Sequence, residues 1–72
     1  MKILDSFGLR IKKLRKIKKL SQEELAELSG LHRTYISSLE RGQRNPTLTT
    51  LSLISKGLNV TIDELLKELD FE

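Results

Sequence analysis

The sequence predicts an all-α fold of five short helices, arranged as one domain over residues 1–72. Apolar residues recur at spacings of three and four, as at Phe7 and Ile11, which is typical of helices with one buried face. Ser21 and Thr61 each precede a glutamate by three residues, and this capping-box spacing marks helix starts. Glycine and proline residues separate the predicted helices. A chain of 72 residues supports only a small core.

The first helix is predicted over residues 7–19, with Asp5 or Ser6 as its cap and Ile17 at the end of its apolar stripe. Its second half carries six cations: Lys12, Lys13, Arg15, Lys16, Lys18 and Lys19. Cations complement the dipole at a helix C-terminus, and they also suit a surface near phosphates. A basic amphipathic helix can instead lie on an acidic membrane. That alternative is less consistent with the well-marked helix that follows.

The second helix is predicted to begin after Ser21, where the capping box lies. Leu25 and Leu28 are expected to face the core. Ala26 is small where another helix must cross closely. Gly30, four residues later, suits a helix end and a turn at positive φ.

A third helix is predicted from His32 to Arg41, with Ile36 and Leu39 on its inner face because they are spaced by three. Residues 22–41 therefore read as a helix, a glycine-containing turn and a second helix. This is the helix-turn-helix unit, whose second helix can enter the DNA major groove. An ordinary αα-hairpin in a small bundle is the alternative.

The outer face of this third helix offers short hydroxyls with cations at its edges. Arginine pairs with guanine acceptors, and serine or threonine can bond to several bases. We therefore expect base contacts from Arg33, Thr34 and Ser37, with Tyr35 at the margin. Phosphate contacts are expected from Ser38 and Arg41 on the same helix.

Two further polar residues lie near helix starts. Gln22 is in the first turn of the second helix, where the helix dipole favours anions, so its amide is expected to contact a phosphate. His32 is expected to be a helix cap or a phosphate neighbour. It has no second histidine and no cysteine as partner, so no metal site is predicted.

Glu40 is an acid near the expected DNA-facing surface, so we predict that it points inward and pairs with Arg15 on the first helix. A buried carboxylate must be paired, because an unpaired buried charge is costly. This ion pair would be structural rather than catalytic.

Residues 42–46 read as a loop, because Gly42 suits a helix end and Pro46 prevents immediate helix continuation. Arg44 and Asn45 project from this loop and are expected at backbone phosphates, which set register rather than sequence. Thr47 is the expected cap of a fourth helix over residues 48–58. Its predicted buried row is Leu48, Leu51, Ile54 and Leu58.

The last helix is predicted to open at Thr61, with Glu64 completing a second capping box. It carries more apolar surface than a short terminal helix can bury in a small core: Ile62, Leu65, Leu66, Leu69 and Phe71. Residues 59–72 are therefore the expected dimerisation region, and the alternative is that these side chains all pack internally.

The charge distribution separates two parts of the chain. Residues 1–44 hold eleven Lys/Arg and five Asp/Glu, giving +6, whereas residues 45–72 hold two and five, giving −3; together they make the net charge of +3. A basic part followed by an acidic one suits a polyanion-binding surface beside a second interaction surface.

Composition also excludes several classes of protein. There is no cysteine, so neither disulfides nor a thiolate metal site is available. No apolar run approaches a membrane span, and the N-terminal apolar stretch is too short for a signal peptide. We therefore expect a cytoplasmic protein with no cofactor and no small-molecule ligand. No carboxylate pair or nucleophile–base pair suggests an enzyme.

The stretch LSQEELAELSGLHRTYISSLERGQRNPTLTTLSLISKGLNVTIDELL resembles the helix-turn-helix domains of the XRE family, which includes the lambda-type repressors and Cro. The resemblance covers about residues 7–66, and the run RTYISSLERGQRNPTL is most similar to the controller proteins of restriction–modification systems. It implies a five-helix lambda repressor-like fold, in which residues 22–41 are the reading unit. It also implies that Arg15 pairs with Glu40 and that Gln22 contacts phosphate. The base-facing residues that it implies are Arg33, Thr34 and Ser37, and it places Arg44 and Asn45 near the DNA backbone. The family often has Ser or Thr where this chain has His32.

The resemblance and the outer face of the third helix together predict a homodimeric, sequence-specific DNA-binding regulator of transcription. Its expected partners are a near-palindromic double-stranded operator, a second copy of the chain and RNA polymerase. The alternative is the antitoxin of a toxin–antitoxin pair, which would bind a toxin through the last helix and also bind its own promoter.

Overall fold

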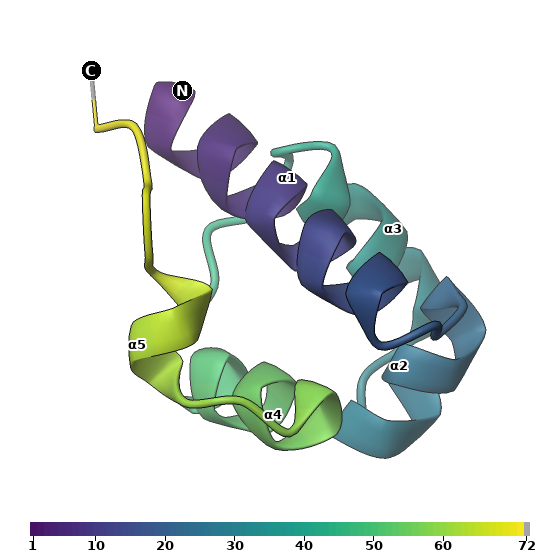
Figure 1. The fold of residues 1–72 in the computed structure, drawn as a ribbon. Helices are drawn as coiled ribbons and strands as arrows, with labels where there is room; N and C mark the ends of the chain where they lie inside the picture. The colour runs from purple at the N-terminus through teal and green to yellow at the C-terminus, as the bar shows by residue number, and fades with distance from the viewer. Residues whose placement is uncertain (72) are drawn as a thin grey trace.

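The computed structural model describes residues 1–71 and contains five α-helices, with no strand in that part of the chain. Figure 1 shows how they are arranged. The helices are α1 (Lys2–Ile17), α2 (Gln22–Ser29), α3 (Arg33–Glu40), α4 (Leu48–Leu58) and α5 (Ile62–Leu65). The predicted all-α, five-helix fold is confirmed. None of the helices in residues 1–71 is long and apolar enough to cross a membrane.

The core lies where α1, α3 and the α2–α4 pair meet. Helix α2 packs against α4, α1 packs against α3, and α5 contacts both α1 and α4. Every helix contributes buried side chains: Phe7, Ile11, Leu14, Leu25, Ala26, Ile36, Leu39, Ile54, Leu58 and Leu65. The predicted inner face of the third helix, Ile36 and Leu39, is confirmed, whereas of the two residues predicted for the second helix only Leu25 is buried.

Local capping chemistry fixes the start of α2 and of α4, as predicted. Ser21 Oγ accepts a hydrogen bond from the Glu24 backbone N–H at 3.0 Å, and the Glu24 carboxylate accepts one from the Ser21 N–H at 2.8 Å. Thr47 caps α4 through the Thr50 N–H. Gly30 ends α2 in the left-handed conformation, with φ of 76°. Because these signals lie within a few residues of each other, the sequence alone locates them.

The ends of the chain differ from the prediction. Helix α1 begins at Lys2, not at residue 7, so Asp5 and Ser6 lie inside it and cap nothing. Instead, Ser6 Oγ accepts a hydrogen bond from the Asp70 backbone N–H at 2.9 Å, which places the C-terminal segment beside α1. The predicted last helix is also too long, because α5 ends at Leu65 after four residues.

The predicted capping box at Thr61 is half correct. Thr61 Oγ1 accepts the Glu64 N–H at 3.2 Å. The Glu64 carboxylate, which would complete the box, accepts a hydrogen bond from Arg10 Nη2 at 3.0 Å instead. Arg10 Nε also donates to the Glu64 carbonyl at 2.9 Å. A charged partner on α1 therefore competes successfully with the local backbone N–H.

Three apolar side chains predicted to be buried are exposed. Leu28 lies outside the buried row of α2, which runs through Leu25, Ala26 and Ser29. Ile17 and Leu48 are exposed because each is at the end of its helix, beyond the cover of neighbouring elements.

Candidate nucleic-acid interface

Helix α3 presents a polar face to solvent and an apolar face to the core. Ile36 and Leu39 are fully buried, whereas Arg33 and Thr34 are exposed and Ser37 is half-buried. The α2–α3 turn is closed by a hydrogen bond from the Leu31 N–H to the Ala26 carbonyl at 3.0 Å. This arrangement projects the outer side of α3 from the molecule, as a helix-turn-helix unit requires.

The inward-pointing acid of α3 is paired as the sequence predicts. Arg15 Nε and Nη2 donate to the two carboxylate oxygens of Glu40 at 2.7 and 3.0 Å. Arg15 Nη1 also donates to the Leu20 carbonyl at 2.8 Å, at the turn before α2. Both residues are buried, so this two-pronged ion pair fixes α1, the α1–α2 turn and the end of α3 relative to one another.

The hydrogen bond with Glu40 raises the pKa of the Arg15 guanidinium above its usual value, although burial acts in the opposite direction. Arg15 therefore stays charged at any ordinary pH. Gln22 joins the same group, because its Nε2 donates to Glu40 Oε1 at 3.1 Å. The side chain predicted to contact a phosphate is thus anchored at the N-terminus of α2, with one amide N–H committed to Glu40.

Gly8 allows the close approach of α1 to α3, and sequence reasoning missed it. A Cβ atom at Gly8 would lie 2.5 Å from the Leu39 carbonyl oxygen and 2.6 Å from that of Glu40. Both neighbours are backbone atoms, so neither can move aside as a side chain can. A glycine inside a predicted apolar stripe is the only signal that could have indicated this contact.

The loop after α3 folds back onto the outer side of that helix. Gly42 turns the chain at φ of 76°, and a Cβ there would meet Asp5 Oδ1 at 2.1 Å. Arg44 Nε then donates to Ser38 Oγ at 3.0 Å, and its guanidinium carbon lies 5.5 Å from the centre of the Tyr35 ring. Ser38, expected on the outer face as a phosphate contact, is therefore buried under Arg44, and that placement was wrong.

The remaining predicted contact residues are divided between this face and the loop before α4, where Asn45 lines an apolar groove. Arg41 hydrogen-bonds to Ser37 Oγ and donates to Gln43 Oε1 at 3.3 Å. His32 and Asn45 are exposed, and within residues 1–71 the His32 side chain makes no capping hydrogen bond to α3. A cationic rim with hydroxyls at its centre is thus assembled from α3 and the following loop, beside the Gln22 amide of α2.

Comparison with known proteins identifies the family. Residues 11–65 match HTH_3, whose description is helix-turn-helix. The chain belongs to the HTH_3 family.

This HTH_3 chain is similar to controller proteins of restriction–modification systems. It is 50% identical over 66 residues to control protein C.SmaI of Serratia marcescens, covering 92% of this chain and 79% of that protein. The crystal structure of controller protein C.AhdI from Aeromonas hydrophila superposes with a TM-score of 0.84 at 47% identity, covering 86% of this chain and 94% of that one. A C.Esp1396I tetramer in complex with its natural 35 base-pair operator gives 0.78 at 45% identity, covering 90% and 96%.

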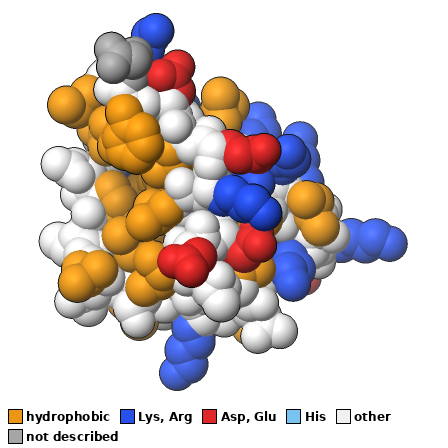
Figure 2. Space-filling model, turned by 60° about the vertical axis from the view of Figure 1, so that its left-hand side comes forward, with side chains coloured by type: hydrophobic (Ala, Val, Ile, Leu, Met, Phe, Trp, Pro, Cys, Tyr) orange, Lys and Arg blue, Asp and Glu red, His pale blue; other side chains and the backbone are white. Residues whose placement is uncertain are grey.

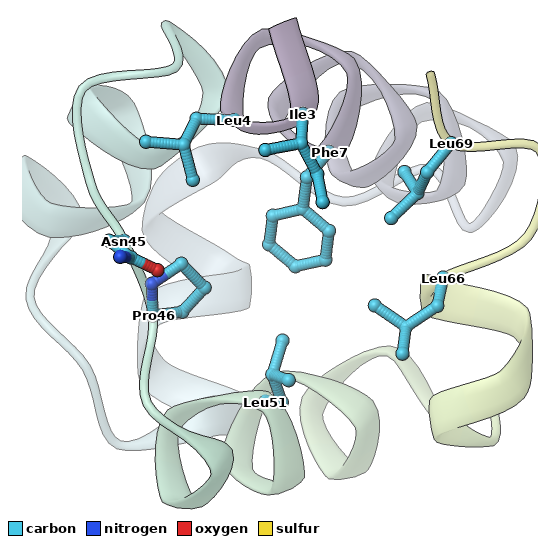
Figure 3. Close-up of a pocket in the computed structure, with 8 residues that line it drawn as sticks. All are labelled: Ile3, Leu4, Phe7, Asn45, Pro46, Leu51, Leu66 and Leu69. Atoms are coloured by element: carbon cyan, nitrogen blue, oxygen red, sulfur yellow. The ribbon is translucent and has the colours of Figure 1, made fainter. Parts of the chain in front are cut away.

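A second surface of this HTH_3 chain is apolar. Figure 2 shows hydrophobic side chains gathered over α5 and the C-terminal segment. Figure 3 shows a groove there, lined by residues from α1, the loop before α4, α4 and the C-terminal region. Its lining residues are Ile3, Leu4, Phe7, Asn45, Pro46, Leu51, Leu66 and Leu69.

The five residues predicted for a dimer interface divide into three groups by exposure. Leu65 is fully buried in the core of the monomer, so it is unavailable to a partner and its assignment was wrong. Ile62 and Leu69 are half-buried, whereas Leu66 and Phe71 are 41% and 71% exposed. Of the predicted region 59–72, residue 72 lies outside the described residues.

Proposed function

We infer that this chain is the controller protein of a restriction–modification system, a non-enzymatic transcriptional regulator that binds operator DNA. The observation that carries this conclusion is the exposed polar face of α3 in a complete helix-turn-helix unit. Its similarity along most of its length to controller proteins, one of them crystallised on its operator, supports the same conclusion. Because its ligand is DNA, we place the protein in the cytoplasm.

The proposed base contacts are those of the exposed side of α3. Arg33 is at the start of the helix, where the recognition helix of such units meets base edges, and its guanidinium can pair with guanine O6 and N7. Thr34 and Ser37 follow on the same side and can approach closely because they are short. Tyr35 is at the margin of this surface.

The proposed phosphate contacts surround that face, and each is a hydrogen-bond donor. They are Gln22, His32, Arg41, Arg44 and Asn45. Gln22 is held at the α2 N-terminus, where helix dipole and free backbone N–H groups favour an anion. Such contacts set the position of α3 on the duplex rather than its sequence preference.

We further propose that the apolar groove and the exposed Leu66 and Phe71 form the surface on which a second copy docks. A 72-residue chain buries a smaller fraction of its surface than a larger domain does, so a shared apolar surface would add stability. A two-fold dimer would place two α3 helices in successive major grooves about 34–36 Å apart on a near-palindromic operator. A regulator bound beside a promoter would also lie within reach of RNA polymerase.

Selection of bound duplexes from a random DNA pool, at roughly physiological salt, tests this function. We expect a two-fold symmetric site with half-sites about one helical turn apart. Light scattering of the free protein should give the mass of two chains. Binding without any enriched sequence would contradict the proposed function, because it would reduce the cationic rim to a general polyanion surface.

A further inference from the structure

We propose that Ser38 and Tyr35 are positioning residues, which hold the Arg44 guanidinium in a fixed orientation for binding a DNA phosphate. This proposal rests on the proposed function, because it takes the DNA surface around α3 as given. It assigns to Ser38 a role through another side chain, in place of a direct contact. It also gives the Tyr35 ring a use other than reading bases.

The burial of Ser38 has a specific cause. Ser38 follows the core residue Ile36 by two positions, which places it about 200° around the helix from Ile36, on the outer side. A serine there would normally be exposed to water, yet only 6% of Ser38 is accessible. The cover comes from the loop after Gly42, whose Arg44 lies across this part of α3.

The hydrogen bonds at Ser38 form a chain with a single direction. A hydroxyl has one hydrogen to donate, and Ser38 Oγ donates it to the Tyr35 carbonyl at 2.9 Å. The oxygen is therefore left as an acceptor, and it receives Arg44 Nε at 3.0 Å. The bond to the Tyr35 carbonyl fixes the orientation of the hydroxyl hydrogen. The Ser38 oxygen therefore faces Arg44 as an acceptor before any DNA is present.

The Tyr35 ring restrains the same guanidinium from a second side. Arg44 Cζ lies 5.5 Å from the ring centroid, within the range in which a cation is attracted to an aromatic face. In residues 1–71 neither Nη1 nor Nη2 of Arg44 donates a hydrogen bond. Both terminal NH2 groups of the planar guanidinium therefore remain available side by side, which suits two phosphate oxygens.

This arrangement affects the affinity for DNA through the entropic cost of ordering the Arg44 side chain. Immobilising a long side chain on binding opposes association, and an arginine that is already held by the fold avoids most of that cost. We therefore expect loss of the Ser38 hydroxyl to raise the Kd for operator DNA by about two- to tenfold per half-site, although Ser38 itself touches no DNA.

A double-mutant cycle on operator DNA, measured by fluorescence anisotropy, tests the proposal. Ser38→Ala is expected to raise the Kd in the wild-type background and to have no effect in an Arg44→Ala background. The matched control is Ser55→Ala, which removes another helix hydroxyl bonded to a backbone carbonyl, in α4, and should leave the Kd unchanged. Circular dichroism melting of each variant establishes that it is folded.

The salt dependence of binding tests whether Arg44 itself contacts phosphate, as the proposal requires. Arg44→Ala should reduce the slope of log K against log salt by about 0.9 for each lost phosphate contact, whereas Ser38→Ala should keep the wild-type slope. Tyr35→Leu should bind more weakly, because it removes the aromatic ring that faces the Arg44 guanidinium.

Two results would overturn the proposal while leaving the function intact. One is an equal loss of affinity for Ser38→Ala with and without Arg44, in a protein that still selects its operator. The other is a wild-type salt slope for Arg44→Ala. Failure of the wild-type protein to prefer any sequence is a different result, which concerns the proposed function itself.

Discussion

Replacing Glu40 with glutamine should destabilise the fold by about 3–5 kcal/mol, because it leaves the Arg15 charge buried without its partner. The side chains of Arg15 and Glu40 are only 10% and 3% exposed. Three N–H groups, two from Arg15 and one from Gln22, converge on the carboxylate. Glutamine keeps the size of the side chain but turns one of the two acceptors into a donor that faces these N–H groups.

The size of this effect is large relative to the stability of so small a protein. At about 0.05–0.15 kcal/mol per residue, a 72-residue chain is stable by roughly 4–11 kcal/mol. The substitution would therefore remove between about a quarter and all of the free energy of unfolding. We expect Glu40→Gln to be partly unfolded at room temperature in the lower part of that range.

Urea unfolding followed by circular dichroism at a fixed protein concentration measures this effect. The concentration is held constant because the proposed dimer would add to apparent stability. The pKa of Arg15 is raised, so its charge persists at every pH suited to the experiment. A loss below about 1 kcal/mol would refute the reasoning, since that is the value of an exposed ion pair.

The double variant Arg15→Met/Glu40→Leu tests whether the buried ion pair stabilises the fold more than apolar side chains in the same place. Apolar replacements of a buried pair are often neutral or stabilising, so the double variant should be more stable than either single one. It should nevertheless bind DNA less tightly, because Gln22 loses the carboxylate that anchors its amide.

Three other substitutions test the remaining features. Gly8→Ala should lower stability by about 1–3 kcal/mol, because the new methyl group meets backbone carbonyls of α3, and Leu9→Ala on the exposed side of α1 is its control; an unchanged melting temperature would contradict the close packing. Leu66→Glu should give monomers in sedimentation and weaker operator binding, and an unchanged sedimentation coefficient would reject the groove as the interface. Arg33→Ala should cost about 1–3 kcal/mol of binding and relax the preference at one base pair; an equal loss on every sequence would exclude a base-reading role.

The features that could be predicted from sequence are those set by local chemistry. The cap of α2 depends on Ser21 and a glutamate three residues away, and the bounds of α4 follow from Thr47 and the residues after it. The inner face of α3 follows from the spacing of Ile36 and Leu39. The Arg15–Glu40 pair could also be predicted, because an acid beside a surface expected to bind DNA must point inward and pair with a buried cation.

The features that could not be predicted depend on residues far apart in the sequence. Glu64 was assigned to a capping box, but Arg10, more than fifty residues away along the chain, takes its carboxylate. Leu65 was assigned to an interface, but the core holds it. Neither the Arg10–Glu64 hydrogen bond nor the burial of Leu65 can be predicted without knowing that α1 and α5 are in contact.

Ser37 and Ser38 show the same limit within the proposed DNA surface. Both are serines on the outer half of α3, and helical periodicity assigns them the same environment. The structure separates them, because Arg41 reaches Ser37 at the surface whereas Arg44 covers Ser38. The difference arises from the path of the loop after Gly42, which the periodicity of α3 does not encode. A contact predicted from a helix face alone must therefore be tested against the loop that follows the helix. Here that loop places Arg44 over Ser38, so that Ser38, itself predicted to contact phosphate, instead holds another predicted phosphate contact.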